Sequence, residues 1–131
     1  MKASEFALSN YGLHVEGLLD AISHALKQAT VSARVVLRCR LVIEELAVNA
    51  IRHGGATDVV VTVVVSNRIS ITIQDDGLGF DPFSSVTPDI SEALTERSIG
   101  GLGLHIIRSE CSETRYMRSG QFNIMSVEIE L

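Results

Sequence analysis

Lysine is scarce in this sequence of 131 residues, which contains only Lys2 and Lys27. Neither lysine lies near a glycine-rich segment, and the pattern G-x-x-x-x-G-K-[ST] is absent, which excludes the Walker A loop of P-loop enzymes. The lysine that protein kinases of the common fold use beside their glycine-rich loop is missing for the same reason. Any phosphate chemistry in this chain therefore depends on other groups.

Cysteine, long apolar runs and excess positive charge are also lacking. Cys39 and Cys111 are the only cysteines, and their separation matches neither a metal site nor a redox pair. No apolar run reaches about 18 residues, so we expect no transmembrane helix and no membrane partner. The first residues lack the apolar stretch of a secretory signal, and the sparse cysteines favour a cytoplasmic location. A formal charge of −5 argues against direct nucleic-acid binding.

Hydrophobic residues make up 46% of the sequence, enough for the core of one domain over residues 1–131. Helical spacing of apolar residues predicts helices over about 15–29 and 33–53, with Ser32 as the cap of the second. A third helix is predicted over 103–111. Between them, a loop rich in Gly, Pro, Ser and Asp runs from about 75 to 99, longer than compact domains usually tolerate without a functional reason.

Strands are predicted at 4–9, in "DVVVTVVVSN" and "RISITIQ" around a turn at Ser66-Asn67, and in "ETRYMR" and "FNIMSVEIEL" around Ser119-Gly120. Adjacent hairpins indicate a mixed, mostly antiparallel sheet, and the helices would cover its apolar face. The predicted fold class is α+β, as a two-layer α/β sandwich with helices on one face of the sheet.

The segment "VIEELAVNAIRHGG", residues 42–55, combines apolar residues with a regular polar row. Glu45, Asn49 and His53 recur every four residues, so on a helix they lie along one face. A polar row on an otherwise apolar helix needs a partner or a ligand.

Two glycine clusters flank the long loop: "DDGLGFD" and "GGLGLHII". Glycines let backbone N–H groups approach a ligand, and at a helix N-terminus they favour phosphate. The second cluster departs from G-x-G-x-x-G at its last position and follows no clear strand, so a dinucleotide fold is disfavoured. Each cluster alone is explained as a turn, but two clusters after the polar helix indicate a phosphate ligand, with Mg²⁺ and backbone groups replacing lysine.

"EELAVNAIRHG", "DDGLGFD" and "GGLGLHII", in this order and spacing, resemble the N, G1 and G2 boxes of the Bergerat-fold (GHKL) ATPases. The short length and the lead-in "ERSIGGLGLHIIR" look most like the small serine kinases of the anti-sigma-factor type. The resemblance covers roughly residue 41 to the C-terminus. It implies the sandwich of this superfamily, with ATP and Mg²⁺ as cofactors.

The resemblance implies roles for the polar row and the first glycine cluster. Asn49 would coordinate Mg²⁺ and Glu45 would be the general base; the competing interpretations are a buried amide and a solvated glutamate. Asp75 would accept a hydrogen bond from the adenine amine, since Asp76 breaks the family spacing. Gly77 and Gly79 would let the loop pass close to the base.

The second cluster would form the hinge of a lid and present N–H groups to the phosphates; the implied contacts are Gly100, Gly101, Leu102, Gly103 and Leu104. His53 would approach a phosphate or simply end its helix. Arg97 would contact the γ-phosphate or a protein partner. Phe80 fits the core better than the adenine pocket.

The function that the resemblance implies is an ATP-dependent protein serine/threonine kinase. Its substrate would be a STAS-domain anti-sigma-factor antagonist, with a sigma factor as a second partner and a homodimer as the assembly. Two alternatives stay open: a non-catalytic ATP-dependent protein-interaction module, and a detached histidine-kinase ATPase domain.

Overall fold

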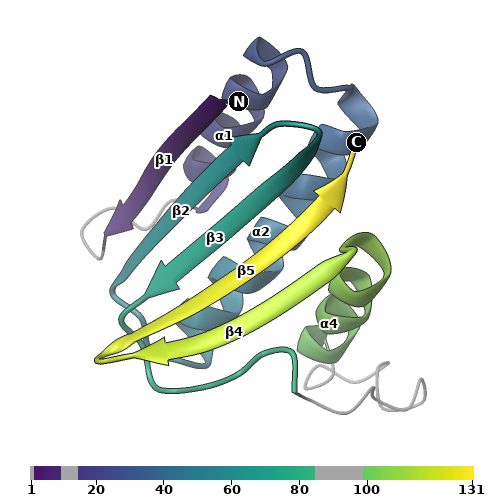
Figure 1. The fold of residues 1–131 in the computed structure, drawn as a ribbon. Coiled ribbons are helices and arrows are strands. Elements are labelled where there is room, and N and C mark those ends of the chain that lie inside the picture. Colours follow the sequence, from purple (N-terminus) through teal and green to yellow (C-terminus); the bar gives the residue numbers. More distant parts are fainter. Residues whose placement is uncertain (1, 10–14, 85–98) are drawn as a thin grey trace.

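The computed structural model describes residues 2–9, 15–84 and 99–131. A five-stranded sheet has the order β1-β2-β3-β5-β4 (Figure 1). Every pairing in the described sheet is antiparallel, in agreement with the mostly antiparallel sheet that the sequence predicts, and β2–β3 and β4–β5 are the two predicted hairpins. The strands are β1 (Lys2–Ser9), β2 (Asp58–Val65), β3 (Arg68–Asp75), β4 (Glu113–Ser119) and β5 (Phe122–Glu130).

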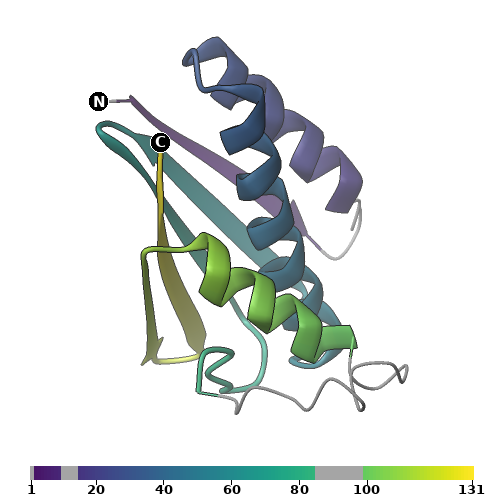
Figure 2. The same cartoon turned by 90° about the vertical axis from the view of Figure 1, so that its right-hand side faces the viewer.

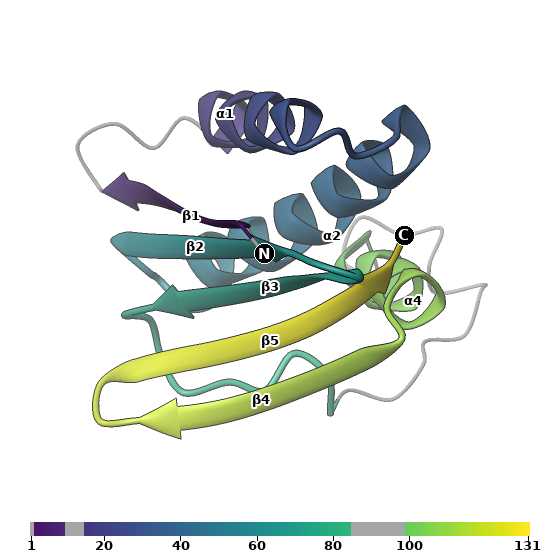
Figure 3. The ribbon, with the colours of Figure 1, turned by 45° about the horizontal axis from the view of Figure 1, so that its top comes forward.

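The described helices all lie on one face of this sheet (Figures 2 and 3). They are α1 (Val15–Gln28), α2 (Ala33–Arg52) and α4 (Ile99–Glu110). α2 contacts both other helices as well as β3 and β5, while α1 contacts β1. The predicted two-layer α/β sandwich is confirmed. Within the described ranges, no helix is both long and apolar enough to cross a membrane.

Alternation along the strands builds the core between the two layers. In β3, Ile69, Ile71 and Ile73 point toward the helices and are buried, while the residues between them are only partly covered. α2 turns a wide apolar stripe toward the sheet, with period 3.6. The buried residues of this stripe are Val35, Val36, Cys39, Val42, Ile43, Leu46, Ala47 and Ala50.

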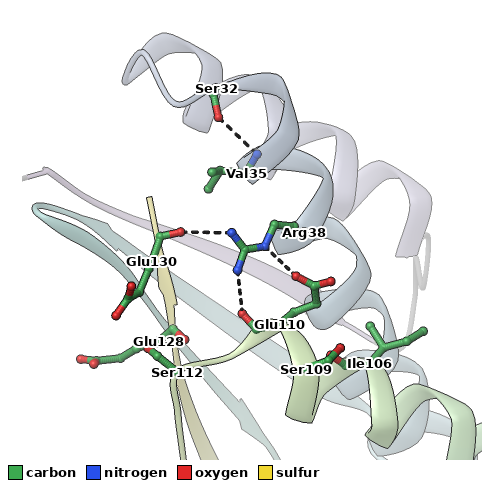
Figure 4. A network of polar contacts seen from close by, with 9 residues as sticks. All are labelled: Ser32, Val35, Arg38, Ile106, Ser109, Glu110, Ser112, Glu128 and Glu130. Carbon is green, nitrogen blue, oxygen red and sulfur yellow. Dashed lines mark hydrogen bonds and ion pairs between the residues drawn. The ribbon is translucent and has the colours of Figure 1, made fainter.

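The N-terminus of α2 is capped as predicted, since Ser32 Oγ accepts a hydrogen bond from the backbone N–H of Val35 at 3.3 Å (Figure 4). Near the next turn, Arg38 joins α2 to two other elements. Its guanidinium donates to Glu110 Oε2 at 2.6 Å, to the Glu110 carbonyl at 3.1 Å and to the Glu130 carbonyl at 3.4 Å. A cation at a helix C-terminus is favoured by the helix dipole, so Arg38 fixes the end of α4.

The start of α4 differs from the prediction. The helix begins at Ile99, before Gly100 and Gly101, whereas the sequence predicted a start at Gly103. Glycine has low helix propensity, but packing of α4 on α2 outweighs it, as the buried Ile107 shows. Gly100 and Gly101 therefore belong to the first helical turn and not to a preceding loop.

Candidate functional site

The predicted polar row of α2 is present, and its first two members are in contact. Asn49 Nδ2 donates a hydrogen bond to Glu45 Oε1 at 3.0 Å, and both side chains are partly buried. The α-helical spacing of four residues places them one above the other. His53 is the exposed C-cap residue, and its backbone N–H bonds the Asn49 carbonyl. His53 therefore lies at the C-terminal end of α2, which is the simpler of the two roles that the sequence suggests for it.

Glu45 lies in surroundings that disfavour its charge. Burial raises the pKa of its carboxyl above the ordinary value, and the neighbouring Glu44 raises it further. The hydrogen bond from Asn49 and the charge of His53 lower the pKa, but burial outweighs them. A carboxylate with a raised pKa is a stronger base than an ordinary one at neutral pH.

Gly103 lies directly against this carboxyl group. A Cβ atom added at Gly103 would overlap the carboxyl carbon and both oxygens of Glu45. Glycine at this position leaves room for the Glu45 carboxyl group, which a side chain at residue 103 would displace. The first turn of α4, just before Gly103, leaves backbone N–H groups without partners inside the helix.

Asp75 closes the other end of the site, at the end of β3. It is 2% exposed, and its Oδ1 accepts hydrogen bonds from the Gly77 N–H at 2.8 Å and from Asn123 Nδ2 at 3.0 Å. A small pocket beside it includes Asn49, so residues from two predicted motifs meet there. The lining residues are Leu46, Asn49, Ala50, Gly54, Asp75, Leu78, Phe80, Pro82, Asn123 and Met125. Phe80 is 46% exposed and lines the pocket, so its assignment to the core was wrong.

Asp76, the competing aspartate, is engaged elsewhere. Its Oδ1 accepts the backbone N–H groups of Thr57 and Asp58 at 2.7 and 3.0 Å, and its Oδ2 accepts the Thr57 hydroxyl at 2.5 Å. These hydrogen bonds, led by that from the Thr57 hydroxyl, lower the pKa of Asp76. Asp76 therefore holds the turn before β2, while Asp75 faces the pocket.

Gly77 and Gly79 of the first cluster differ in how much room a side chain would have at each position. A Cβ at Gly77 would lie 2.8 Å from the Gly54 carbonyl oxygen and 2.9 Å from Asp75 Oδ1, both too close. A Cβ at Gly79 would meet only the Arg118 side chain, at an ordinary 3.7 Å. Backbone crowding thus explains Gly77 and does not explain Gly79.

Sequence reasoning missed a residue that organises the Asp75 end, Asn123 of β5. It is 3% exposed and bonds Asp75, Tyr116 and Arg118. One signal was available: Asn123 occupies the inward phase of β5 that Met125, Val127 and Ile129 fill with apolar side chains. A polar residue in a buried apolar phase requires partners.

The oxygen of Asn49 fits a hard cation. Its amide nitrogen is used by Glu45, whereas no hydrogen bond to its Oδ1 occurs within the part of the chain that the structure describes. An amide oxygen is a suitable Mg²⁺ ligand, and Mg²⁺ commonly takes few protein ligands and keeps waters. The described residues contain no group of three His, Cys, Asp or Glu side chains placed for a metal.

Several predicted contacts are seen only in part. Arg97 lies outside the described residues. Gly100, Gly101, Leu102 and Leu104 are described as backbone of α4.

Cys39 and Cys111 are free thiols, and burial raises the pKa of each to about 12, so both stay protonated at neutral pH.

The sequence matches the histidine kinase-like ATPase domain over residues 9–129. The sensor histidine kinase ComP of Bacillus subtilis (strain 168) is 34% identical over 55 residues, which are 41% of this chain and only 7% of ComP. This chain therefore corresponds to a small part of that relative.

Two solved structures show the same fold. A chain of the SiaB-SiaC complex from Pseudomonas aeruginosa has a TM-score of 0.61 and 14% identity, covering 100% of this chain and 90% of that chain. The histidine kinase AdeS of Acinetobacter baumannii has a TM-score of 0.52 and 21% identity, covering 99% of this chain and 68% of that chain. With a family match over most of its length, the chain belongs to the histidine kinase-like ATPase domain family of the GHKL type.

Proposed function

We propose that this chain is a protein serine/threonine kinase of the anti-sigma-factor type that uses ATP and Mg²⁺. Membership of the ATPase domain family implies ATP binding and a kinase or ATPase activity. The observation that carries the finer proposal is the hydrogen bond between Glu45 and Asn49, because Asn49 also lines the pocket that Asp75 closes. A candidate base thus lies one hydrogen bond away from the wall of a candidate nucleotide pocket.

Asp75 would select the nucleotide base. Its buried carboxylate is an acceptor that matches the exocyclic amine of adenine, while the carbonyl of guanine at the same place would be repelled. The phosphates would lie toward the first turn of α4, where N–H groups without partners inside the helix and the helix dipole favour anions. Asn49 Oδ1 would hold Mg²⁺, whose charge offsets that of the phosphates in a pocket without a nearby lysine.

Glu45 would act on the attacking hydroxyl group. As the serine or threonine oxygen bonds to the γ-phosphorus, its proton passes to the Glu45 carboxylate. The bond between the γ-phosphorus and the bridging oxygen breaks, and ADP leaves with that electron pair. The raised pKa of Glu45 increases its affinity for this proton.

A STAS-domain anti-sigma-factor antagonist is the proposed substrate, with a sigma factor as a second partner. The lead-in "ERSIGGLGLHIIR" supports this branch by resemblance. A structural neighbour solved as a SiaB-SiaC complex supports a protein partner.

A homodimer is also proposed. The uncharged side chains Val60, Thr62, Ser70 and Thr72, on the sheet face away from the described helices, offer a surface to a second copy.

The test is a pull-down from the native cytoplasm with ATP and with ADP, followed by phosphosite mapping on the captured protein. We expect ATP-dependent, acid-stable phosphoserine or phosphothreonine on a small regulatory protein. Acid-labile phosphate would favour a histidine-kinase ATPase domain, since ComP and AdeS are both histidine kinases. Nucleotide-dependent capture without any phosphorylation would favour a non-catalytic interaction module.

A further inference from the structure

The side chain of Asn123 is used at both ends of its amide group. Its Oδ1 accepts the Tyr116 hydroxyl at 2.6 Å, Arg118 Nη1 at 3.2 Å and the Phe80 N–H at 3.4 Å. Its Nδ2 donates to Asp75 Oδ1 at 3.0 Å and to the Leu78 carbonyl at 2.8 Å. Asn123 therefore connects β4, the loop after β3 and the pocket.

The hydrogen bonds settle which way the amide points. Arg118 has donors and no acceptor, so it requires the oxygen of Asn123 on its side. Asp75 and the Leu78 carbonyl are acceptors, so they require the nitrogen. A reversed amide would place an oxygen against the Asp75 carboxylate and leave Arg118 facing an NH₂ group. The arrangement is thus directional, from Arg118 through Asn123 to Asp75.

Asp75 is constrained as a result. Both of its hydrogen bonds within the described residues, from Gly77 and from Asn123, go to Oδ1. The carboxylate plane is therefore fixed, and Oδ2 is the oxygen left for a ligand. Arg118 also donates to the Gly77 carbonyl at 2.8 Å, which holds the loop that supplies the other donor.

We propose that Asn123 is the positioning residue that sets base specificity, by holding Asp75 so that one carboxylate oxygen faces a purine 6-amino group. This inference rests on the proposed nucleotide function of the pocket. A base with a 6-oxo group would place its carbonyl oxygen against an acceptor that is held in this orientation. Without Asn123, Asp75 would keep only the hydrogen bond from Gly77, so its carboxylate would be held less firmly and discrimination against 6-oxo purines would fall.

A purely structural role for Asn123, as a link between the hairpin and the loop, makes a different prediction. Loss of that link would weaken the binding of all nucleotides by the same factor. The discriminating quantity is therefore the ratio of the dissociation constants of ATP and inosine triphosphate, which differ at the 6-position.

The experiment is calorimetric titration of the full chain with each nucleotide in the presence of Mg²⁺. We expect Asn123→Ala to reduce the preference for ATP over inosine triphosphate by roughly 10-fold, the effect of one charge-assisted hydrogen bond. Tyr116→Phe is the matched control: it removes one bond to Asn123 Oδ1 and leaves the bond to Asp75, so the ratio should stay within about 2-fold of wild type.

Asn123→Asp gives a second reading in a side chain of the same size. It replaces the donor with an acceptor facing Asp75, so the hydrogen bond to Asp75 Oδ1 is lost and ATP affinity should fall. An unchanged ratio of dissociation constants in Asn123→Ala, whether or not both affinities fall by the same factor, would overturn the inference. It would leave the proposed nucleotide function untouched. Wild-type protein that binds neither nucleotide would instead refute the proposed function.

Discussion

At the Asp75 end of the site, the side chains of Asp75 and Asn123 are almost fully buried and held by hydrogen bonds from β4, β5 and the loop after β3. At the Glu45 end, one hydrogen bond joins two partly buried side chains, and a carboxyl group with a raised pKa lies against the backbone of a helix. The first end suits recognition, which needs fixed acceptors. The second suits proton transfer, which needs a group that changes charge.

The largest expected effect comes from removing the proton acceptor at the Glu45 end. Glu45→Gln keeps an oxygen for the Asn49 hydrogen bond but cannot take a proton, so phosphotransfer should fall by about 100-fold or more. ATP affinity should change by less than about 3-fold, since the Asp75 end is untouched. Rates and titrations of Glu44→Gln, its exposed neighbour, provide the control. Unimpaired phosphotransfer in Glu45→Gln would refute the general-base role.

Gly103→Ala tests whether α4 positions that carboxylate. The added methyl group would displace Glu45 or α4, and misplacement of about 1 Å can cost on the order of 100-fold in rate. The Glu45 carboxyl group is the far end of a flexible side chain and can move aside, so the rate should fall while the melting temperature changes little. In a Glu45→Ala background the clash is removed, and Gly103→Ala should become stabilising. A stabilised, fully active single variant would contradict this contact.

Asp75→Asn changes the rigid end. Replacing the acceptor carboxylate should weaken ATP binding by roughly 10- to 100-fold, the range for a hydrogen bond to a charged group. Asp76→Asn is the matched control: it should lower thermal stability through the Thr57 contacts and leave ATP affinity nearly unchanged. Wild-type affinity in Asp75→Asn would show that adenine is bound in some other way.

The smallest effect is the pH dependence of stability that Glu45 introduces. Its pKa is raised in the folded state, so the folded protein holds the proton more tightly than the unfolded chain. The stability from this group is present below the unfolded pKa and is lost as pH rises through the folded pKa. Urea denaturation should therefore show Glu45→Gln gaining up to about 1 kcal/mol relative to wild type between pH 4 and pH 7, limited by solvent screening. A relative loss over this interval would refute a raised pKa.

Local patterns in the sequence predict much of the framework. The Ser32 cap, the stripe of α2 and the alternation of β3 depend on neighbours in sequence, and all three are confirmed. The contact of Glu45 with Asn49 also follows from helix geometry alone. These features needed no knowledge of the sheet order.

Features that depend on packing between distant segments were not predictable. The predicted start of α4 was wrong because the low helix propensity of glycine argued against a helix at Gly100 and Gly101. Contacts between α4 and α2 stabilise the helix there. The phase of Asn123 in β5 marks it as buried, but its partners come from β3, β4 and the loop after β3, and only strand register brings them together. Gly103 was assigned to a hinge, whereas its close approach to Glu45 needs the crossing of two helices.

The Arg38 contacts also have a mechanical consequence. They hold the C-terminal end of α4 against α2 and β5, while the glycine-rich first turn lies at the other end of its 12 residues. A helix of this length is roughly 18 Å long, so a tilt of about 5° around the fixed end moves the first turn by about 1.5 Å. The first turn is therefore the part of α4 that lies farthest from the Arg38 contacts, and any rotation about them would displace it most.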